Sequence, residues 1–177
     1  VGFGKVQQVL SPSSERREAP CTHQGFNVNE CGGCPWQFVS YAAQLTAKAE
    51  RVARQLGRWG IESSLLRPII AAPDEWGYRN RAQFKTDGDV LGYVSRGSHQ
   101  LVDVQSCPIL TPLNEQTLTS LRSQLPNAQW RIDRRQRQPW HTLDIDDEHE
   151  GALLDRRLPF RQGNTAQNKV MQDWLKR

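Results

Sequence analysis

The four cysteines of the chain have the spacing of metal ligands. Cys31 and Cys34 form a C-x-x-C pair within CGGC, Cys21 precedes this pair, and Cys107-Pro follows much later. Four thiolates can close a tetrahedral zinc site or hold one [4Fe–4S] cluster. The two glycines of CGGC suit either centre, because both need tight turns with backbone N–H groups aimed at sulfur. Zinc ribbons commonly carry two C-x-x-C pairs, so a single pair favours iron–sulfur.

Other interpretations of the cysteines remain open. Zinc fits the same four sulfurs, and His23, two residues after Cys21, could replace one of them. A thioredoxin-type redox pair would follow a buried strand, and no such pattern precedes Cys31. Four unrelated reduced thiols are the remaining alternative. Disulfides are not expected, because the composition predicts a cytoplasmic protein, where thiols stay reduced.

Composition excludes several classes of protein. The 177 residues carry 23 Lys and Arg against 19 Asp and Glu, a net charge of +4, and 37% are hydrophobic. No run approaches the roughly 20 apolar residues of a membrane helix. The first residues lack the apolar core of a secretory signal. The weak positive charge is compatible with a nucleic-acid partner, and six Trp argue against disorder.

The elements that must position these residues alternate along the chain. Residues 1–10 predict a short strand, and 11–20 predict a polar linker. Apolar residues recur at helical spacing from Ser40 to Trp59, with Gly60 as a stop. Residues 78–104 predict a hairpin around Asp87-Gly88-Asp89 and a third strand, and Thr111-Pro112 starts a helix that ends near 124. Strands are expected at 128–134 and 140–145, a solvated acidic loop at 144–150, and a last helix from 165. The fold class is therefore α+β, with a small antiparallel or mixed sheet and flanking helices around a cysteine-bound metal.

Arginine clusters are the candidate nucleic-acid contacts. Arginine forks suit phosphate, and exposed aromatic rings suit base stacking. The alternative for each arginine cluster is a solvated protein surface that contacts no RNA. The basic face of the 40–59 helix is likewise either an RNA contact or a solvated surface. The predicted RNA-binding residues are Arg79 and Arg81 in YRNR, and Arg131, Arg134 and Arg135 between two tryptophans.

The order of these motifs resembles the S-adenosylmethionine-dependent RNA uracil-C5 methyltransferases that carry an iron–sulfur cluster. Bacterial members act on 23S ribosomal RNA, and cluster-free relatives act on transfer RNA. The likeness runs over nearly the whole chain. It rests on CGGCPWQ (31–37), YRNRAQF (78–84), LGY (91–93), GSHQLVDVQSCPILTP (97–112) and the F-x-Q-x-N spacing of residues 160–164.

The resemblance implies roles for particular residues. Cys21, Cys31, Cys34 and Cys107 would bind one [4Fe–4S] cluster, and Gln162 would contact the methyl donor. Residues 1–19 would end an N-terminal RNA-binding barrel, 20–158 would form the iron–sulfur RNA-recognition domain, and 159–177 would begin the methyltransferase domain. The family has five residues between its first two cysteines, whereas nine separate Cys21 from Cys31, and the extra residues should bulge as a loop.

The chemistry of the family needs groups that this chain does not contain. Its uracil-C5 methyl transfer uses a glycine-rich donor loop, a nucleophilic cysteine and a glutamate base. The chain has no such loop, and the implied cluster would use all four of its cysteines. We therefore expect a monomeric, RNA-binding portion of such an enzyme that is inactive alone, with S-adenosylmethionine bound only in a full-length protein. A stand-alone RNA-binding module with structural zinc or iron–sulfur, or a small electron carrier, are the alternatives.

Overall fold

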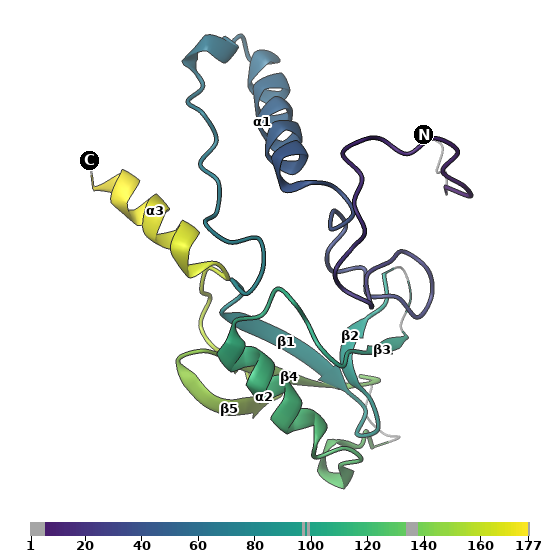
Figure 1. Ribbon diagram of the computed structural model, residues 1–177. Helices are drawn as coiled ribbons and strands as arrows, with labels where there is room; N and C mark the ends of the chain where they lie inside the picture. Colours follow the sequence, from purple (N-terminus) through teal and green to yellow (C-terminus); the bar gives the residue numbers. More distant parts are fainter. Residues whose placement is uncertain (1–5, 97, 99, 134–137, 177) are drawn as a thin grey trace. The chain divides into compact units, whose positions relative to one another are not determined.

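Two units make up the fold in the computed structural model, which describes residues 6–96, 98, 100–133 and 138–176 (Figure 1). The helical unit comprises residues 6–19 and 36–70, and the sheet unit comprises residues 20–35 and 71–176 with those gaps. The chain thus enters the sheet unit twice. All four cysteines belong to the sheet unit.

The sheet unit is built on five antiparallel strands in the order β3-β2-β1-β4-β5. The strands are β1 (Arg81–Thr86), β2 (Leu91–Val94), β3 (Leu101–Asp103), β4 (His141–Asp146) and β5 (His149–Leu154). The β1–β2 hairpin, the third strand and β4 confirm the sequence prediction. The α+β class is confirmed as well, with a purely antiparallel sheet.

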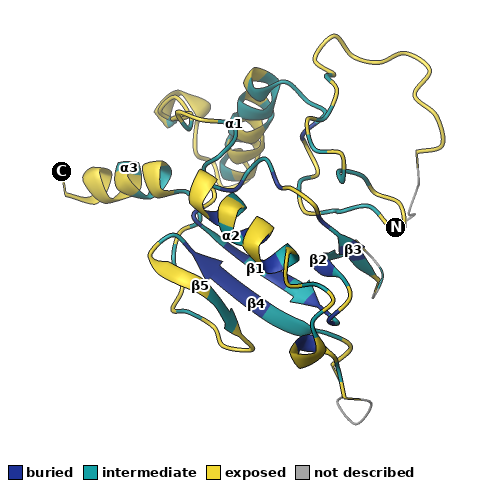
Figure 2. Cartoon of the chain, turned by 60° about the horizontal axis from the view of Figure 1, so that its bottom comes forward, coloured by how far each residue is buried: buried dark blue, intermediate teal, exposed yellow. Residues whose placement is uncertain are grey.

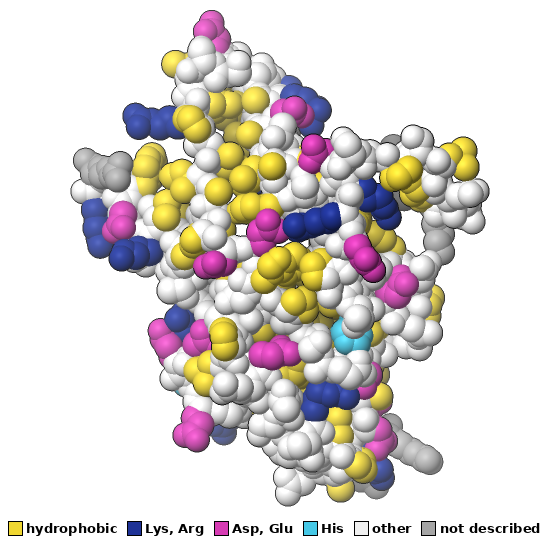
Figure 3. All heavy atoms as spheres, in the orientation of Figure 1, with side chains coloured by type: hydrophobic (Ala, Val, Ile, Leu, Met, Phe, Trp, Pro, Cys, Tyr) yellow, Lys and Arg dark blue, Asp and Glu magenta, His cyan; other side chains and the backbone are white. Residues whose placement is uncertain are grey.

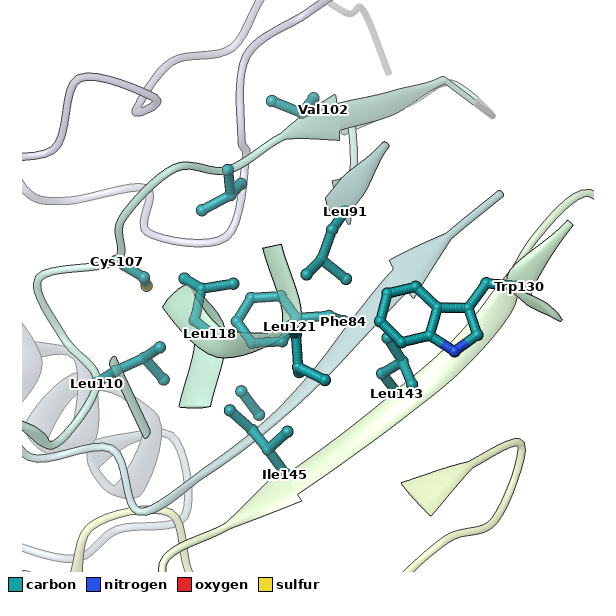
Figure 4. Packing of buried hydrophobic residues seen from close by; sticks show 12 residues of the cluster. Phe84, Leu91, Val102, Cys107, Leu110, Leu118, Leu121, Trp130, Leu143 and Ile145 are labelled. Atoms are coloured by element: carbon teal, nitrogen blue, oxygen red, sulfur yellow. The ribbon is translucent and has the colours of Figure 1, made fainter. Parts of the chain in front are cut away.

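The core lies between one face of this sheet and α2 (Pro112–Arg122), as Figure 2 shows. Side chains alternate across a strand, so β1 buries Ala82, Phe84 and Thr86 and leaves the residues between them half-exposed. Leu118 and Leu121 of α2 belong to the same cluster as Phe84 (Figure 4). The other buried members are Leu91, Val102, Val104, Cys107, Leu110, Trp130, Leu143 and Ile145.

Side-chain caps start the three α-helices. In α2 the Thr111 hydroxyl accepts from the backbone N–H of Asn114, and Pro112 occupies the first turn, as predicted. Ser40 caps α1 (Tyr41–Gly57), and Gly60, with φ of +75°, follows its end. Asn164 caps α3 (Thr165–Leu175). All three helices were predicted: α1 from its periodicity and caps, α2 from Thr111 and Pro112, and α3 from its position after residue 164.

Several predicted elements are different in the structure. Of the predicted strand 1–10, residues 6–10 form no strand and 1–5 lie outside the described residues. Of the predicted strand 128–134, residues 128–130 form a 3-10 helix followed by extended chain, because Trp130 turns into the core, and residue 134 lies outside the described residues. The acidic stretch is a β4–β5 hairpin rather than a solvated loop. β5 was not predicted. A second 3-10 helix, Ser63–Leu65, follows α1.

Neither α1 nor α3 contributes a buried residue. The apolar stripe predicted for α1 is present, but Val52 and the following Trp59 are exposed. Figure 3 likewise shows hydrophobic side chains scattered between charged ones on one face of the molecule. No helix within the described ranges combines the length and the apolar character needed to cross a bilayer.

Candidate functional site

Burial and neighbouring thiols raise the pKa values of three of the four cysteines, Cys21, Cys31 and Cys107. Burial raises the pKa of Cys21, and negative charge on Cys34 raises it further. Burial likewise raises the pKa of Cys31, with contributions from Cys34 and Cys21. The pKa of Cys107 rises to about 12, from burial first and then from Cys34 and Cys21. Such coupling requires short separations, so residues from two distant chain segments share one neighbourhood.

Tyr93 of β2 lies in the same neighbourhood. Burial raises the pKa of its phenol well above the ordinary value, and negative charge on Cys107, Cys31 and Cys34 adds to the effect. Its ring packs on Phe84 at a centroid distance of 5.0 Å. The cysteine neighbourhood therefore borders the sheet core, to which Cys107 itself belongs.

Backbone N–H groups point at three of the four sulfurs. The N–H groups of His23 and Gln24 hydrogen-bond to Cys21 and lower the pKa of its thiol. The backbone N–H of Gly33 likewise lowers the pKa of the Cys31 thiol, and the N–H of Ile109 lowers the pKa of the Cys107 thiol. These bonds favour the thiolate and partly oppose the effect of burial.

Hydrogen bonds hold the Cys21 turn against CGGC. The Cys31 N–H donates to the carbonyl of His23 at 2.7 Å, and the Gly25 N–H donates back to the carbonyl of Cys31 at 3.4 Å. Gln24 and Cys31 consequently form an isolated parallel bridge. The nine residues between the two cysteines thus close into a loop, as the sequence predicted.

Two further contacts join this loop to the Cys107 segment. The Gln105 N–H donates to Nε2 of His23 at 3.2 Å, so this nitrogen has a backbone partner. Both carboxylate oxygens of Glu115 accept from the Cys107 N–H, at 3.2 and 3.1 Å. Glu115 stands in the first turn of α2, so the helix fixes the backbone that carries Cys107.

The four cysteines do not form a metal-binding arrangement in the part of the chain that the structure describes. Among the described residues, no group of three or more His, Cys, Asp or Glu side chains could hold a metal ion as placed. The cysteine-bound metal centre expected from the sequence therefore stays a prediction.

The predicted RNA-binding arginines differ in their surroundings. Arg81 donates from Nε to Asp144 at 2.9 Å, forms an ion pair with the same carboxylate, and also donates to the carbonyls of Leu158 and Pro159. The side chains are 11% exposed for Arg81 and 0% for Asp144. Arg81 is therefore committed to a buried pair, which points to a structural role.

The other arginines are more open. Arg79 is exposed and donates from Nε to the carbonyl of Arg81 at 2.9 Å. Arg131 is 60% exposed and pairs loosely with Asp89 at 3.2 Å. Arg134 and Arg135 lie outside the described residues.

Gln162 lies on a segment that is clamped to the sheet. Asn80, which is buried, donates from Nδ2 to the carbonyl of Gln162 at 3.0 Å and to the Thr165 hydroxyl at 2.8 Å. Arg161 donates to the buried Asp146 at 2.6 Å. The clamp fixes the backbone, while the side chain of Gln162 is exposed.

Sequence reasoning missed Asn80, Asp144 and Asp146 as anchors of this segment. A signal for the two aspartates exists in TLDIDD, where acidic residues alternate with Leu143 and Ile145. Strand alternation puts both aspartates on the face opposite the core, where Arg81 and Arg161 meet them.

Comparison with known proteins finds relatives that are RNA methyltransferases. No protein-family model matches the chain. An uncharacterized RNA methyltransferase of Nitrosomonas europaea is 39% identical over 179 residues, which cover 99% of this chain and 45% of the relative. An uncharacterized RNA methyltransferase of Thermosynechococcus vestitus is 38% identical over 138 residues, which cover 75% of this chain and 29% of the relative. The 23S rRNA (uracil(1939)-C(5))-methyltransferase RlmD of Halomonas elongata is 37% identical over 129 residues, covering 70% and 26%.

The chain spans less than half the length of these relatives. Its homologues are RNA methyltransferases, and they include enzymes named for uracil-C5 methylation of 23S rRNA.

Proposed function

We propose that this chain is the iron–sulfur, RNA-recognition portion of an RNA uracil-C5 methyltransferase and does not transfer methyl groups by itself. The observation that carries the proposal is the hydrogen bonding that joins the Cys21 turn both to CGGC and to the Cys107 segment: the Cys31 N–H donates to the His23 carbonyl, and the Gln105 N–H donates to Nε2 of His23. The names of the relatives support RNA, and ribosomal RNA in particular, as the partner.

The side chains present suit a thiolate-bound cluster. Four sulfurs are available, and backbone N–H groups point at three of them, which is the environment that iron–sulfur sulfurs need. Cys21, Cys31, Cys34 and Cys107 would hold one [4Fe–4S] cluster, which would supply a covalent tie between the 20–35 loop and the segment before α2. The His23 carbonyl and the Glu115 carboxylate would position Cys31 and Cys107 by accepting from their backbone N–H groups.

RNA binding is assigned to the exposed arginines. Arg79 and Arg131 are open to solvent, and Arg134 and Arg135 belong to the same predicted set. We leave Arg81 out of the contact surface, because a phosphate would have to displace its buried carboxylate partner. Gln162 would contact S-adenosylmethionine only in a longer protein that contains the donor loop.

Metal analysis tests the cluster. Anaerobic reconstitution of the 177-residue chain with iron and sulfide should give a brown protein with about four iron atoms per chain. Each of the single variants Cys21→Ser, Cys34→Ser and Cys107→Ser should lose the brown colour. Ser106→Ala, beside Cys107, should keep it. If the chain instead binds one equivalent of zinc and takes up no iron, the site is a zinc site and the iron–sulfur assignment is wrong. Unaltered iron content in the Cys107→Ser variant would overturn the proposed ligand set.

RNA binding and activity are tested separately. Filter binding to 23S rRNA fragments at two salt concentrations should show affinity that falls as salt rises, because Arg and Lys displace counterions. Arg131→Gln should weaken binding, while the exposed Arg156→Gln, which was not predicted to contact RNA, serves as the matched control. Labelled methyl donor should give no RNA methylation, and methylation by the chain alone would contradict the proposal.

A further inference from the structure

The loop between Cys21 and Cys31 exposes apolar side chains on an ordered backbone. Phe26 is 46% exposed and Val28 is 62% exposed. This loop is also where the chain departs from the spacing of the family it resembles. An exposed phenyl ring on a fixed loop is a candidate contact surface.

Hydrogen bonds on both sides hold this loop. Asn27 donates its N–H to the Glu30 carboxylate at 2.7 Å, and Glu30 returns its own N–H to the Asn27 carbonyl at 3.2 Å. The Ser95 hydroxyl donates to the Asn27 carbonyl at 3.3 Å, and the Gln100 amide donates to Asn29. The loop is therefore pinned to the β2–β3 connection, within the sheet unit.

Arg96, on that connection, completes the surface. Its guanidinium carbon lies 5.9 Å from the centroid of the Phe26 ring, and its side chain is exposed. The aliphatic part of the Arg96 side chain packs against Gly32. A Cβ added at Gly32 would lie only 2.4 Å from the Cβ of Arg96. Arg96 forms no ion pair with any residue in the described part of the chain, so its charge is uncompensated by a neighbouring acid.

A planar cation beside a half-exposed ring matches one partner chemistry well. Unpaired nucleobases stack on aromatic faces and on guanidinium planes, and the adjoining phosphate pairs with the cation. A base in a duplex is already stacked on its neighbours and offers no free face. The pair therefore suits single-stranded RNA better than double-stranded RNA.

We propose that Phe26 and Arg96 form a stacking site for one unpaired RNA base, beside the cysteine loop. This site rests on the proposed function, because that function supplies RNA as the partner. It is separate from the arginines assigned above, and it adds a preference for an unpaired nucleotide. The nine-residue loop would hold the site in place.

Fluorescence of a single-stranded oligoribonucleotide that contains 2-aminopurine tests this site. Stacking should quench the fluorescence when the 177-residue chain binds, and anisotropy gives the dissociation constant. Phe26→Leu should weaken binding roughly tenfold and remove the quenching, since leucine keeps bulk but has no π face. Phe26→Trp should retain both, and Arg96→Lys, which keeps charge but loses the plane, should reduce the quenching.

Controls separate the possible outcomes. Phe160→Leu removes a ring that is 86% exposed elsewhere in the sheet unit, and it should change nothing. If the unsubstituted chain binds but Phe26→Leu and Arg96→Lys both match Phe160→Leu, the stacking site is wrong and the proposed function stands. If the unsubstituted chain binds no RNA, the proposed function fails and this site fails with it. Circular dichroism checks that each variant is folded. If Phe26→Leu does not fold, the loss or retention of quenching in Arg96→Lys tests the stacking site.

Discussion

Individual residues of the sheet unit differ in how much of their chemistry the sequence reveals. The cysteines were predicted from type and spacing alone, and the structure brings their thiols into one neighbourhood. The role of Glu115 could not be predicted, because it depends on where the first turn of α2 falls relative to the Cys107 N–H. Arg81 was predicted as a surface residue, since a sequence does not show that a buried carboxylate lies across the strand.

Burial of Cys107 predicts slow alkylation in the metal-free chain. Its pKa of about 12 leaves almost no thiolate at neutral pH, and only thiolate reacts. In the folded, reduced protein, iodoacetamide should modify Cys107 far more slowly than the same cysteine in denaturant. Raising the pH should speed the folded-state reaction steeply. Mass spectrometry of quenched samples follows the rate, and equal rates with and without denaturant would contradict this environment.

The Asp144–Arg81 pair predicts an asymmetric response to charge removal. Asp144→Asn leaves the guanidinium of Arg81 inside the protein without its carboxylate, so unfolding free energy should fall by about 3 kcal/mol. Asp89→Asn, which breaks the exposed pair with Arg131, should cost under about 0.5 kcal/mol. Urea denaturation of both variants measures the difference, and similar values for the two would refute the buried role.

The same pair sets a pH dependence. Burial alone would raise the pKa of Asp144, but hydrogen bonds from Arg81, Leu158 and Gln83 bring it below its ordinary value. A carboxyl whose folded pKa is lowered stabilises the fold above its unfolded pKa of about 3.9, and this stability is lost as the pH falls through the folded pKa. Asp144→Asn should therefore flatten the acid limb of the stability profile, and an unchanged acid limb would exclude Asp144 as its source.

Among the secondary-structure elements, those with local signals were predicted and those set by tertiary packing were not. The caps at Ser40 and Thr111 and the turn around Gly88 are local features, and α1, α2 and the β1–β2 hairpin followed from them. β5 is exposed over most of its length and bends at Gly151, with φ of +76°, so it lacks an alternating pattern. Residues 128–130 have strand-like composition, but burial of Trp130 selects a 3-10 turn.

The cap of α2 predicts a measurable contribution from one hydroxyl. Thr111 accepts from the Asn114 N–H and donates to Asp147 at 2.6 Å, joining the helix to the β4–β5 turn. Thr111→Ala should destabilise the chain by about 1 kcal/mol, whereas Thr111→Ser, which keeps the hydroxyl, should cost less. Thermal unfolding compares the two variants. Equal melting temperatures for Ala and Ser would mean that the hydroxyl contributes nothing.

For the molecule as a whole, the sulfur site and the sheet core are parts of one unit. Cys107 belongs to the hydrophobic cluster, and the 20–35 loop is tied to it through His23 and Gln105. The sequence predicted the sheet, and the role that it assigned to the four cysteines as metal ligands stays a prediction. It could not predict that residues 36–70 would separate from both into another unit.

If the proposed cluster is present, its removal should loosen one region selectively. If a cluster ties the 20–35 loop to the segment before α2, chelation of iron should raise amide hydrogen exchange in residues 20–35 and 105–110. Exchange in α1, which belongs to the helical unit, should not change and provides the internal control. Uniform acceleration over both units would show that the metal supports the entire chain.

The chain leaves the sheet unit after Pro35 and re-enters it at Ala71, and none of the sulfur-bearing residues belongs to the excursion between them. Residues 36–70 pack instead with residues 6–19, through bonds such as the Ser40 N–H to the Glu15 carbonyl. A deletion of residues 36–70 would therefore strip residues 6–19 of their packing partner and leave every thiol in place.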